Sequence, residues 1–191
     1  TAFFEREPEF FIDNNEILAD VLTLYFTDYE PVSCFVAMVQ EKTVGYIIGT
    51  RDVSMMKKIF FRKILSKFIV RLIRGRVFFK KRFLLFSLNV LRSVLRGEFA
   101  APDFSGEYPA TLHINIDKNF RNRGLGSRLI TMYLAYLKEN MVKGVHFGTM
   151  SNGAKEFFLK SEFSILYETK RTWPRYYFKK DMPYYIFGKV L

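Results

Sequence analysis

The stretch "TLHINIDKNFRNRGLG" (residues 111–126) decides the predicted fold, because it joins a strand pattern to a helix pattern through a basic, glycine-containing turn. Residues 111–116 alternate between apolar and polar side chains, as a half-buried strand does. Residues 125–140 are apolar at helical spacing. A further strand pattern, "VHFGTM" (residues 145–150), follows Gly144. Strand, helix and strand in this order predict a right-handed crossover with parallel strands.

The turn itself has the form Arg-x-x-Gly-x-Gly, with Arg121, Gly124 and Gly126 at the defining places. The first N–H groups of a helix have no intrahelical partners and carry a partial positive charge. Glycines at this point allow an anion to approach the backbone closely. The turn lacks the Lys-Ser/Thr pair of a Walker loop and the glycine spacing of the dinucleotide fingerprint. Two interpretations remain, a cradle for a phosphorylated ligand and an ordinary glycine-containing turn.

The remaining patterns complete an α/β chain with a mixed sheet. The predicted elements are helix 13–26, strands 32–39 and 43–50, helices 55–74 and 82–96, strand 111–116, helix 125–140, strand 145–150, helix 154–163 and strands 164–173 and 184–191. Strands 32–39 and 43–50 are expected to form a hairpin across a short polar break. Gly45 and Gly49 in the second of them indicate bulges or a close backbone approach.

This order of elements and this loop resemble the GCN5-related N-acetyltransferase (GNAT) superfamily, whose Arg/Gln-x-x-Gly-x-Gly/Ala loop binds the pyrophosphate of acetyl-CoA. The stretch "YPATLHINI" (residues 108–116) is similar to the acetyltransferase-like domain associated with O-GlcNAc hydrolases, as is the start of the chain. The resemblance covers most of the chain except residues 54–98. It implies one GNAT-like domain over residues 1–191. Its features would be a mostly antiparallel mixed sheet, a splayed parallel strand pair, flanking helices and a basic helical insertion at about 54–98.

The resemblance also implies how acetyl-CoA binds as the cosubstrate, with no metal expected. The pantetheine arm would enter between strands 111–116 and 145–150 and pair with the main chain of the first. The pyrophosphate would meet the backbone N–H groups of the loop, with added charge from the arginines unless these form only a solvated rim. The implied acetyl-CoA-binding residues are Ile114, Ile116, Arg121, Asn122, Arg123, Gly124, Leu125, Gly126, Ser127, Asn152, Phe157 and Phe158.

Acetyl transfer to an amine requires a base, a stabilised oxyanion and a departing thiolate. The backbone N–H near Ile116 is the implied oxyanion donor. His113 is the first candidate base, because an unperturbed imidazole has a pKa near 6.5, and His146 is the second. A hydrogen-bonded structural role is the alternative for each histidine. Asn152 is implied to bind the pantetheine or a water.

Two residues depart from the family's pattern. Asn115 stands where related sequences often carry an acidic residue, and Phe158 stands where a tyrosine is common. The thiolate would then be protonated by Ser151 or by a tyrosine near the chain's end. Alternatively it would leave unassisted, since a thiol has a pKa of about 8.5. We therefore expect an acetyl-CoA-dependent N-acetyltransferase with an unspecified amine acceptor. A CoA-binding or catalytically weak interaction module is the alternative.

The net charge of +11 is concentrated in one segment. Residues 54–97 contain 13 lysines and arginines and no acidic residue, whereas the rest of the chain has 17 basic and 19 acidic residues. In the second predicted helix of this segment, the apolar stripe comprises Leu84, Leu85, Leu88, Leu91 and Leu95. The segment is either a solvated basic face above a core-packed stripe or a surface that contacts an anionic partner through residues 57–96. Such a partner would be phospholipid headgroups, an acidic protein or a phosphorylated acceptor. No nucleic-acid-binding motif accompanies the charge.

The single cysteine, Cys34, excludes an internal disulfide and fits a reducing, cytoplasmic location. Peripheral contact with a membrane surface is compatible with the basic segment. No stretch reaches the roughly 18–20 uncharged apolar residues that a membrane span needs.

Overall fold

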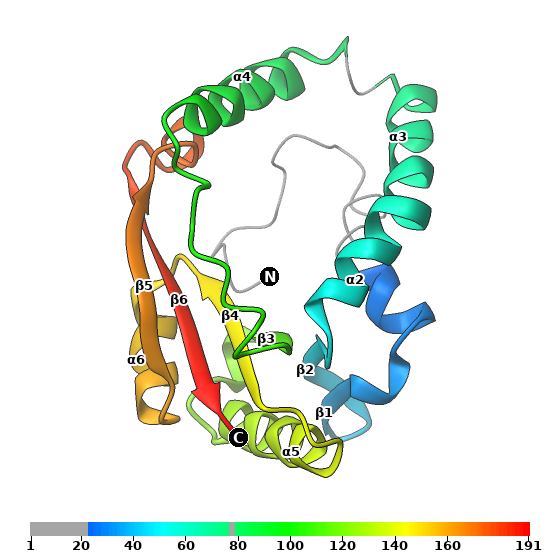
Figure 1. Cartoon of the computed structure of the whole chain (residues 1–191), viewed down its shortest axis with the longest axis vertical. Helices are drawn as coiled ribbons and strands as arrows, with labels where there is room; N and C mark the ends of the chain where they lie inside the picture. The colour runs from blue at the N-terminus through cyan, green and yellow to red at the C-terminus, as the bar shows by residue number, and fades with distance from the viewer. Residues whose placement is uncertain (1–22, 77–78) are drawn as a thin grey trace.

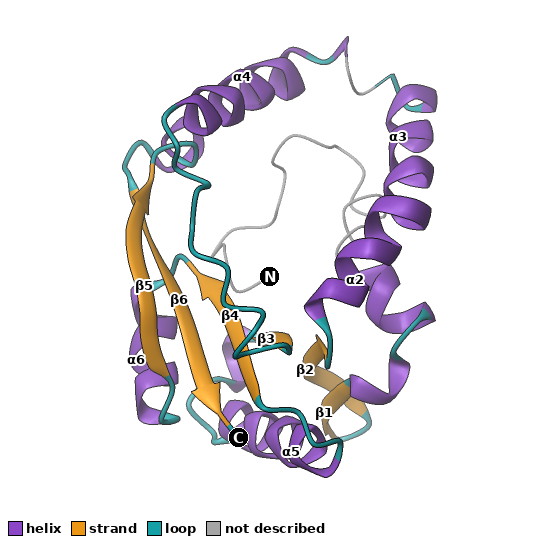
Figure 2. Ribbon diagram, viewed as in Figure 1, coloured by secondary structure: helices purple, strands orange, loops and turns teal. Residues whose placement is uncertain are grey.

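The computed structural model describes residues 23–76 and 79–191, and its strands form two three-stranded sheets. Most of the predicted helix 13–26 lies outside the described residues, and residues 23–28 are helical. Figure 2 shows helices around both sheets, with the strands toward the lower part of the view.

The first sheet has the order β1-β2-β3 and is antiparallel throughout. Its strands are β1 (Phe35–Val39), β2 (Lys42–Thr50) and β3 (Thr111–Ile116). The predicted hairpin is confirmed, and its turn residues Gln40 and Glu41 both have positive φ, as the primed hairpin turns require. The first strand begins later than predicted because Pro31–Ser33 forms a 3-10 turn, η1.

The second sheet has the order β4-β6-β5, also antiparallel. Its strands are β4 (Gly144–Thr149), β5 (Ser164–Arg171) and β6 (Met182–Val190). Helix α6 (Asn152–Lys160) connects β4 to β5, and the short helix α7 (Arg175–Phe178) precedes β6. The core of this half is aromatic. Phe147 packs against Phe158, Phe163 and Phe187, with ring centroids 4.4–5.9 Å apart.

Helix α5 (Leu125–Glu139) crosses from β3 to β4 and holds the two sheets together. Its buried residues are Leu129, Ile130, Tyr133 and Leu137. The Tyr133 hydroxyl donates a hydrogen bond to the Thr111 carbonyl at 2.8 Å. A Cβ at Gly49 would lie only 2.1 Å from that hydroxyl. The close backbone approach predicted at Gly49 is therefore confirmed.

The basic segment forms helices that run from beside β2 to the opposite end of the molecule from α5, where α3 and α4 lie (Figure 1). They are α2 (Val53–Ile59), a π-helical turn η2 (Phe60–Ile64), α3 (Leu65–Arg74) and α4 (Lys81–Leu95). None of the helices within the described ranges is both long and apolar enough to cross a membrane. We call the segment from α2 to α4 the basic arch.

Of the two alternatives for the basic segment, the one in which the leucine stripe of α4 packs into the core is contradicted by the structure. Leu84, Leu88, Leu91 and Leu95 are all exposed. The reason is that α4 is attached by another face, where Ser93 is buried beside Thr172 and Phe86 meets Trp173 edge to face. Helical periodicity identifies an apolar face but not what covers it.

Candidate active site

The parallel strands β3 and β4 separate immediately after their first residues. A single bridge joins Ala110 to Val145, with hydrogen bonds from Ala110 N to Gly144 O (3.1 Å) and from His146 N to Ala110 O (2.9 Å). Beyond this bridge, β3 forms its hydrogen bonds with β2, and β4 forms its hydrogen bonds with β6. A cavity of about 690 Å³ lies in this region.

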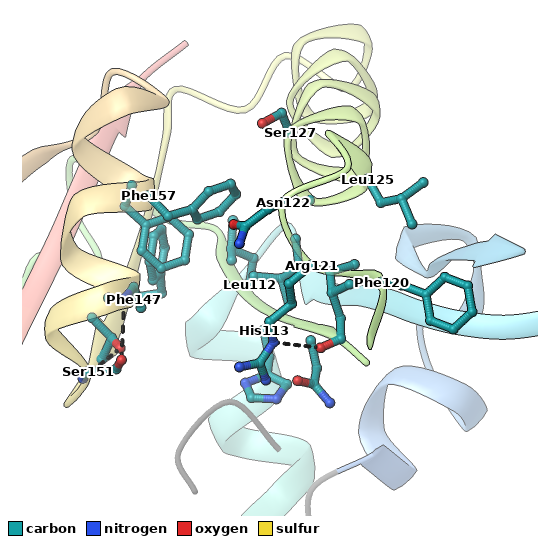
Figure 3. Close-up of a pocket in the computed structure, with 18 of the residues that line it drawn as sticks. Leu112, His113, Phe120, Arg121, Asn122, Leu125, Ser127, Phe147, Ser151 and Phe157 are labelled. Atoms are coloured by element: carbon teal, nitrogen blue, oxygen red, sulfur yellow. Dashed lines mark hydrogen bonds between the residues drawn. The ribbon is translucent and has the colours of Figure 1, made fainter. Parts of the chain in front are cut away.

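The cavity is bounded by β3, the turn after it, the start of α5, the end of β4 and α6 (Figure 3). Its lining residues are Leu112, His113, Ile114, Asn115, Ile116, Phe120, Arg121, Asn122, Gly124, Leu125, Gly126, Ser127, Phe147, Gly148, Thr149, Ser151, Gly153, Ala154, Phe157 and Phe158. Three parts of this lining were not predicted from the sequence as site residues: Leu112, Phe120 and the end of β4. The end of β4 could have been predicted, because β4 is the second strand of the splayed pair and borders the same gap as β3.

The backbone of β3 presents hydrogen-bonding groups to the open side of the strand. Asp117 N donates to Val44 O of β2 at 2.8 Å. Because backbone groups alternate in direction along an antiparallel strand, those of Ile116 and Ile114 point away from β2. Both residues line the cavity. An extended ligand in the cavity therefore has a strand edge beside it.

The N-terminus of α5 also faces the cavity. Gly124 is the N-cap with a φ of 74°, a left-handed conformation that glycine adopts without strain. No side chain caps the helix. The N–H groups of Leu125, Gly126 and Ser127 have no intrahelical acceptor at this position, and all three residues line the cavity. This end of the cavity therefore favours a negatively charged group.

Gly126 lies where α5 and α6 approach one another. A Cβ at this position would lie 3.2 Å from Cζ and 3.3 Å from Cε2 of the Phe157 ring. Figure 3 shows Phe157 of α6 and the N-cap residue Ser151 on one side of the cavity and His113 and Arg121 on the other. Glycine at 126 thus keeps the helix backbone accessible beside an aromatic wall.

The two arginines of the turn have different surroundings. Arg121 lines the cavity, and its Nε donates to the Ile116 carbonyl at 3.0 Å. This bond ties the turn to the end of β3. The guanidinium of Arg123 lies 5.1 Å from the centroid of the Phe120 ring, and Arg123 is not among the cavity-lining residues. The structure therefore brings Arg121 to the cavity, but not Arg123.

The two histidines are also separated. His113 lines the cavity, with its ring centroid 5.9 Å from that of Tyr46. His146 lies outside the cavity lining, and its Nδ1 is 2.5 Å from the Tyr108 carbonyl. Burial lowers the pKa of both imidazoles. His113 is therefore neutral at pH 7 and able to accept a proton, whereas His146 matches the structural alternative.

The residues at the α6 end differ in what they present to the cavity. Phe158 is buried and packs within the aromatic core, although it also lines part of the cavity. Asn152 lines a different, smaller cavity, where its Oδ1 accepts a hydrogen bond from the Tyr185 hydroxyl at 3.1 Å. The Ser151 Oγ accepts from Ala154 N at 3.3 Å. That bond leaves the Ser151 hydroxyl hydrogen free to be donated.

No family model matches the sequence, and no curated protein matches it significantly. Among solved structures, the crystal structure of SsHAT is 22% identical, with 94% of this chain and 82% of that one covered at a TM-score of 0.65. The fold is that of the GNAT acetyltransferases. The Drosophila melanogaster polyamine N acetyltransferase is 14% identical over 88% of this chain and 79% of its own, with a TM-score of 0.53. Ard1 from Thermoplasma volcanium is 18% identical over 88% and 76%, with a TM-score of 0.51.

The GNAT-like mixed sheet predicted from the sequence is thus confirmed, including the splayed strand pair and the flanking helices. Sequence identities of 14–22% support a shared fold. The chemistry is argued from the residues that line the cavity.

Proposed function

We propose that this chain is an acetyl-CoA-dependent N-acetyltransferase that acts on an amine acceptor. The observation that carries the proposal is the cavity beside the splayed strands. It combines an open strand edge on β3 with the uncapped, positively polarised end of α5. An extended amide-containing arm that ends in a pyrophosphate matches these two features at once.

The residues of the cavity divide into two binding regions. Pantetheine amides would pair with the backbone groups of Ile114 and with the carbonyl of Ile116, which point away from β2. The pyrophosphate would accept hydrogen bonds from the N–H groups of residues 124–127, with Asn122 and Arg121 beside them. Phe157 would form an apolar wall against the arm. Of the residues that the resemblance implied, Arg123 and Asn152 are left outside this arrangement, and Phe158 contributes from the core.

The chemistry needs three groups in the cavity. The acceptor amine attacks the thioester carbon, and the C–S bond breaks from the tetrahedral intermediate. The Ile116 N–H would stabilise the oxyanion, and neutral His113 would take the proton that the amine loses. The Ser151 hydroxyl would donate a hydrogen bond to the departing thiolate, which takes its proton from solvent. A donor there is useful but not essential, because a thiol has a pKa of only about 8.5.

The finer assignments belong to the same proposal. The similarity of residues 108–116 to the acetyltransferase-like domain associated with O-GlcNAc hydrolases supports placing the chain in that branch, as one domain with an insertion at about 54–98. One structural neighbour is named a polyamine N acetyltransferase. Polyamines are therefore the first acceptors to test, followed by amino sugars and peptides.

A CoA-binding module with weak catalysis is the second candidate, and two observations favour it. Phe158 is packed into the aromatic core, where it donates no proton. Asn115 lines the cavity without a titratable group. Such a module would bind acetyl-CoA but transfer the acetyl group slowly or not at all.

The test is to measure acetyl-CoA binding and acetyl transfer on the same preparation. Acetyl-CoA at about 100 times its Kd is expected to raise the free energy of unfolding by about 2.7 kcal/mol, seen as a higher Tm. Labelled acetyl transfer to the acceptor panel then separates the two candidates. A Tm that does not respond to acetyl-CoA would contradict both of them.

The pH dependence of turnover tests the role of His113. Because burial lowers its pKa below the usual 6.5, the base is already neutral at pH 7. The acid limb of kcat/KM is therefore expected below pH 6.5, with activity lost as His113 becomes protonated. His113→Gln should remove this limb and lower kcat by about tenfold or more, with little change in acetyl-CoA affinity. Equal turnover in the variant and the parent would exclude His113 from the mechanism.

A further inference from the structure

The basic arch exposes a large amount of apolar surface. On η2 and α3, Phe61 is 65% and Ile73 59% exposed, and on α4 Leu95 is 79% exposed. The other exposed apolar residues of the arch are Met55, Ile69, Val70, Phe79, Leu84, Leu88, Leu91 and Val94. Single exposed apolar residues are normal, but a series of them on consecutive helices indicates an interaction surface.

The same helices carry the positive charge of the chain. Segment 54–97 has 13 basic residues and no acidic one. On α3, the bases Lys67, Arg71 and Arg74 fall on the side of the helix opposite Leu72, at 3.6 residues per turn. The exposed Ile73 lies about 100° around the helix from Leu72, and the exposed Val70 lies about 160° from it, next to Arg74. On α4, Lys81 and Arg92 flank the exposed leucine stripe. Apolar and basic side chains are therefore neighbours on each helix.

We propose that the basic arch binds the surface of an anionic phospholipid bilayer. An amphipathic helix with basic and bulky apolar residues lies in the interface between headgroups and acyl chains. The exposed leucines and Phe61 would enter the acyl boundary, and the lysines and arginines would contact the anionic headgroups. This contact is peripheral.

The charge distribution argues against a second copy of the chain as the occupant. Leu84, Leu88, Leu91 and Leu95 are spaced by four, three and four residues, which also suits a helix-pairing seam. A symmetric pair would, however, bring a further 13 basic residues against the first 13. A bilayer supplies negative charge and an apolar phase together.

A nucleic acid or a soluble acidic polymer would interact with the basic residues of the arch but not with its exposed apolar residues. Phosphate groups would pair with the bases, but the exposed leucines would gain nothing from them. Replacing the leucines with polar residues should therefore weaken binding to a bilayer but not binding to a purely ionic partner.

The arch is attached to the molecule at both of its ends. Val53 N at the start of α2 donates to Pro109 O, just before β3, at 2.8 Å. At the far end, the Glu98 carboxylate accepts a hydrogen bond from Thr172 N at 2.7 Å. In Figure 1, α3 and α4 lie at the opposite end of the molecule from α5, whose N-terminal turn borders the candidate cavity. The arch can therefore be altered without changing that turn, and the proposal does not depend on the enzymatic one.

The experiment is sedimentation of the full chain with vesicles of phosphatidylcholine alone or phosphatidylcholine with phosphatidylserine. The parent is expected to bind the serine-containing vesicles about tenfold more strongly at low salt, and less strongly as salt screens the charge. The ionic variant is Lys58→Glu, Arg62→Glu and Lys67→Glu. Its matched control places the same charge change outside the arch, at Lys138→Glu, Lys160→Glu and Lys180→Glu, all exposed. The ionic variant should lose binding and the control should retain most of it.

The apolar variant is Leu84→Gln, Leu88→Gln and Leu91→Gln, which keeps every charge and a good helix former at exposed positions. It should lose about tenfold or more in vesicle affinity, with an unchanged circular dichroism spectrum. Binding equal to the parent's would overturn the lipid proposal in favour of a purely ionic partner. Equal recovery with both vesicle types would also overturn it. So would a parent that is a dimer by light scattering while the apolar variant is a monomer.

Discussion

Gly126→Glu is expected to abolish the rise in Tm that acetyl-CoA causes in the parent protein. The new side chain begins 3.2 Å from the Phe157 ring and so occupies the wall of the cavity. Its carboxylate would lie at the N-terminus of α5, where it would take the place of the pyrophosphate and repel it. The same charge stabilises the helix end, so the Tm without ligand should stay near that of the parent.

Two further variants show which part of this change matters. Gly106→Glu makes the same charge change where a Cβ meets nothing within 4 Å, and it should respond to acetyl-CoA like the parent. Gly126→Ala adds the Cβ without the charge and should weaken binding less than the glutamate does. A full acetyl-CoA response in Gly126→Glu would show that the pyrophosphate does not bind at this turn.

Gly49→Ala is expected to lower the free energy of unfolding by about 3 kcal/mol or more, because no space exists for the added methyl group. Its Cβ would lie 2.1 Å from the Tyr133 hydroxyl oxygen and 2.4 Å from the Thr111 carbonyl oxygen. The second of these is backbone of β3 and cannot rotate away. Denaturant unfolding measured with circular dichroism gives the change directly.

The matched control for this prediction is Gly106→Ala, where a Cβ meets nothing and φ is not positive. Its free energy of unfolding should stay within about 0.5 kcal/mol of the parent value. Tyr133→Phe in the Gly49→Ala background should restore little, because the ring carbon Cζ is itself 2.4 Å from the added Cβ. A stability of Gly49→Ala close to that of Gly106→Ala would contradict the packing described here.

The sequence predicts the crossover around α5 well because each of its elements has one covered face. Residues 111–116 alternate, and the buried positions of α5 recur at helical spacing. The arch is the counterexample. Its helices are predicted correctly as helices, but the partner of an apolar face is a tertiary property that periodicity does not encode. The exposed stripe from Leu84 to Leu95 could not be distinguished from a buried one in the sequence.

The residues of the candidate site also differ in how well the sequence predicts them. Gly124 and Gly126 could be placed at the start of α5 from the sequence, because adjacent residues determine the turn and the start of the helix. Positions that depend on side-chain direction are not. Arg123 lies over Phe120, and Asn152 turns toward Tyr185 on β6. The contact of Arg123 depends on the conformation of the turn, and that of Asn152 arises from packing between distant parts of the chain. The family resemblance assigned these two residues to the acetyl-CoA site, but neither lines the cavity.

The separation of β3 from β4 has a consequence for how the protein avoids self-association. Among the residues that the structure describes, each of these strands has an edge with no strand ladder beyond the bridge at Ala110 and Val145. Free edges of this kind are templates on which strands of other molecules assemble into aggregates. Here the two edges border a cavity whose walls are α5 and α6, and Arg121 already occupies the Ile116 carbonyl. A slender extended ligand fits between such walls, whereas a strand that belongs to another folded sheet does not.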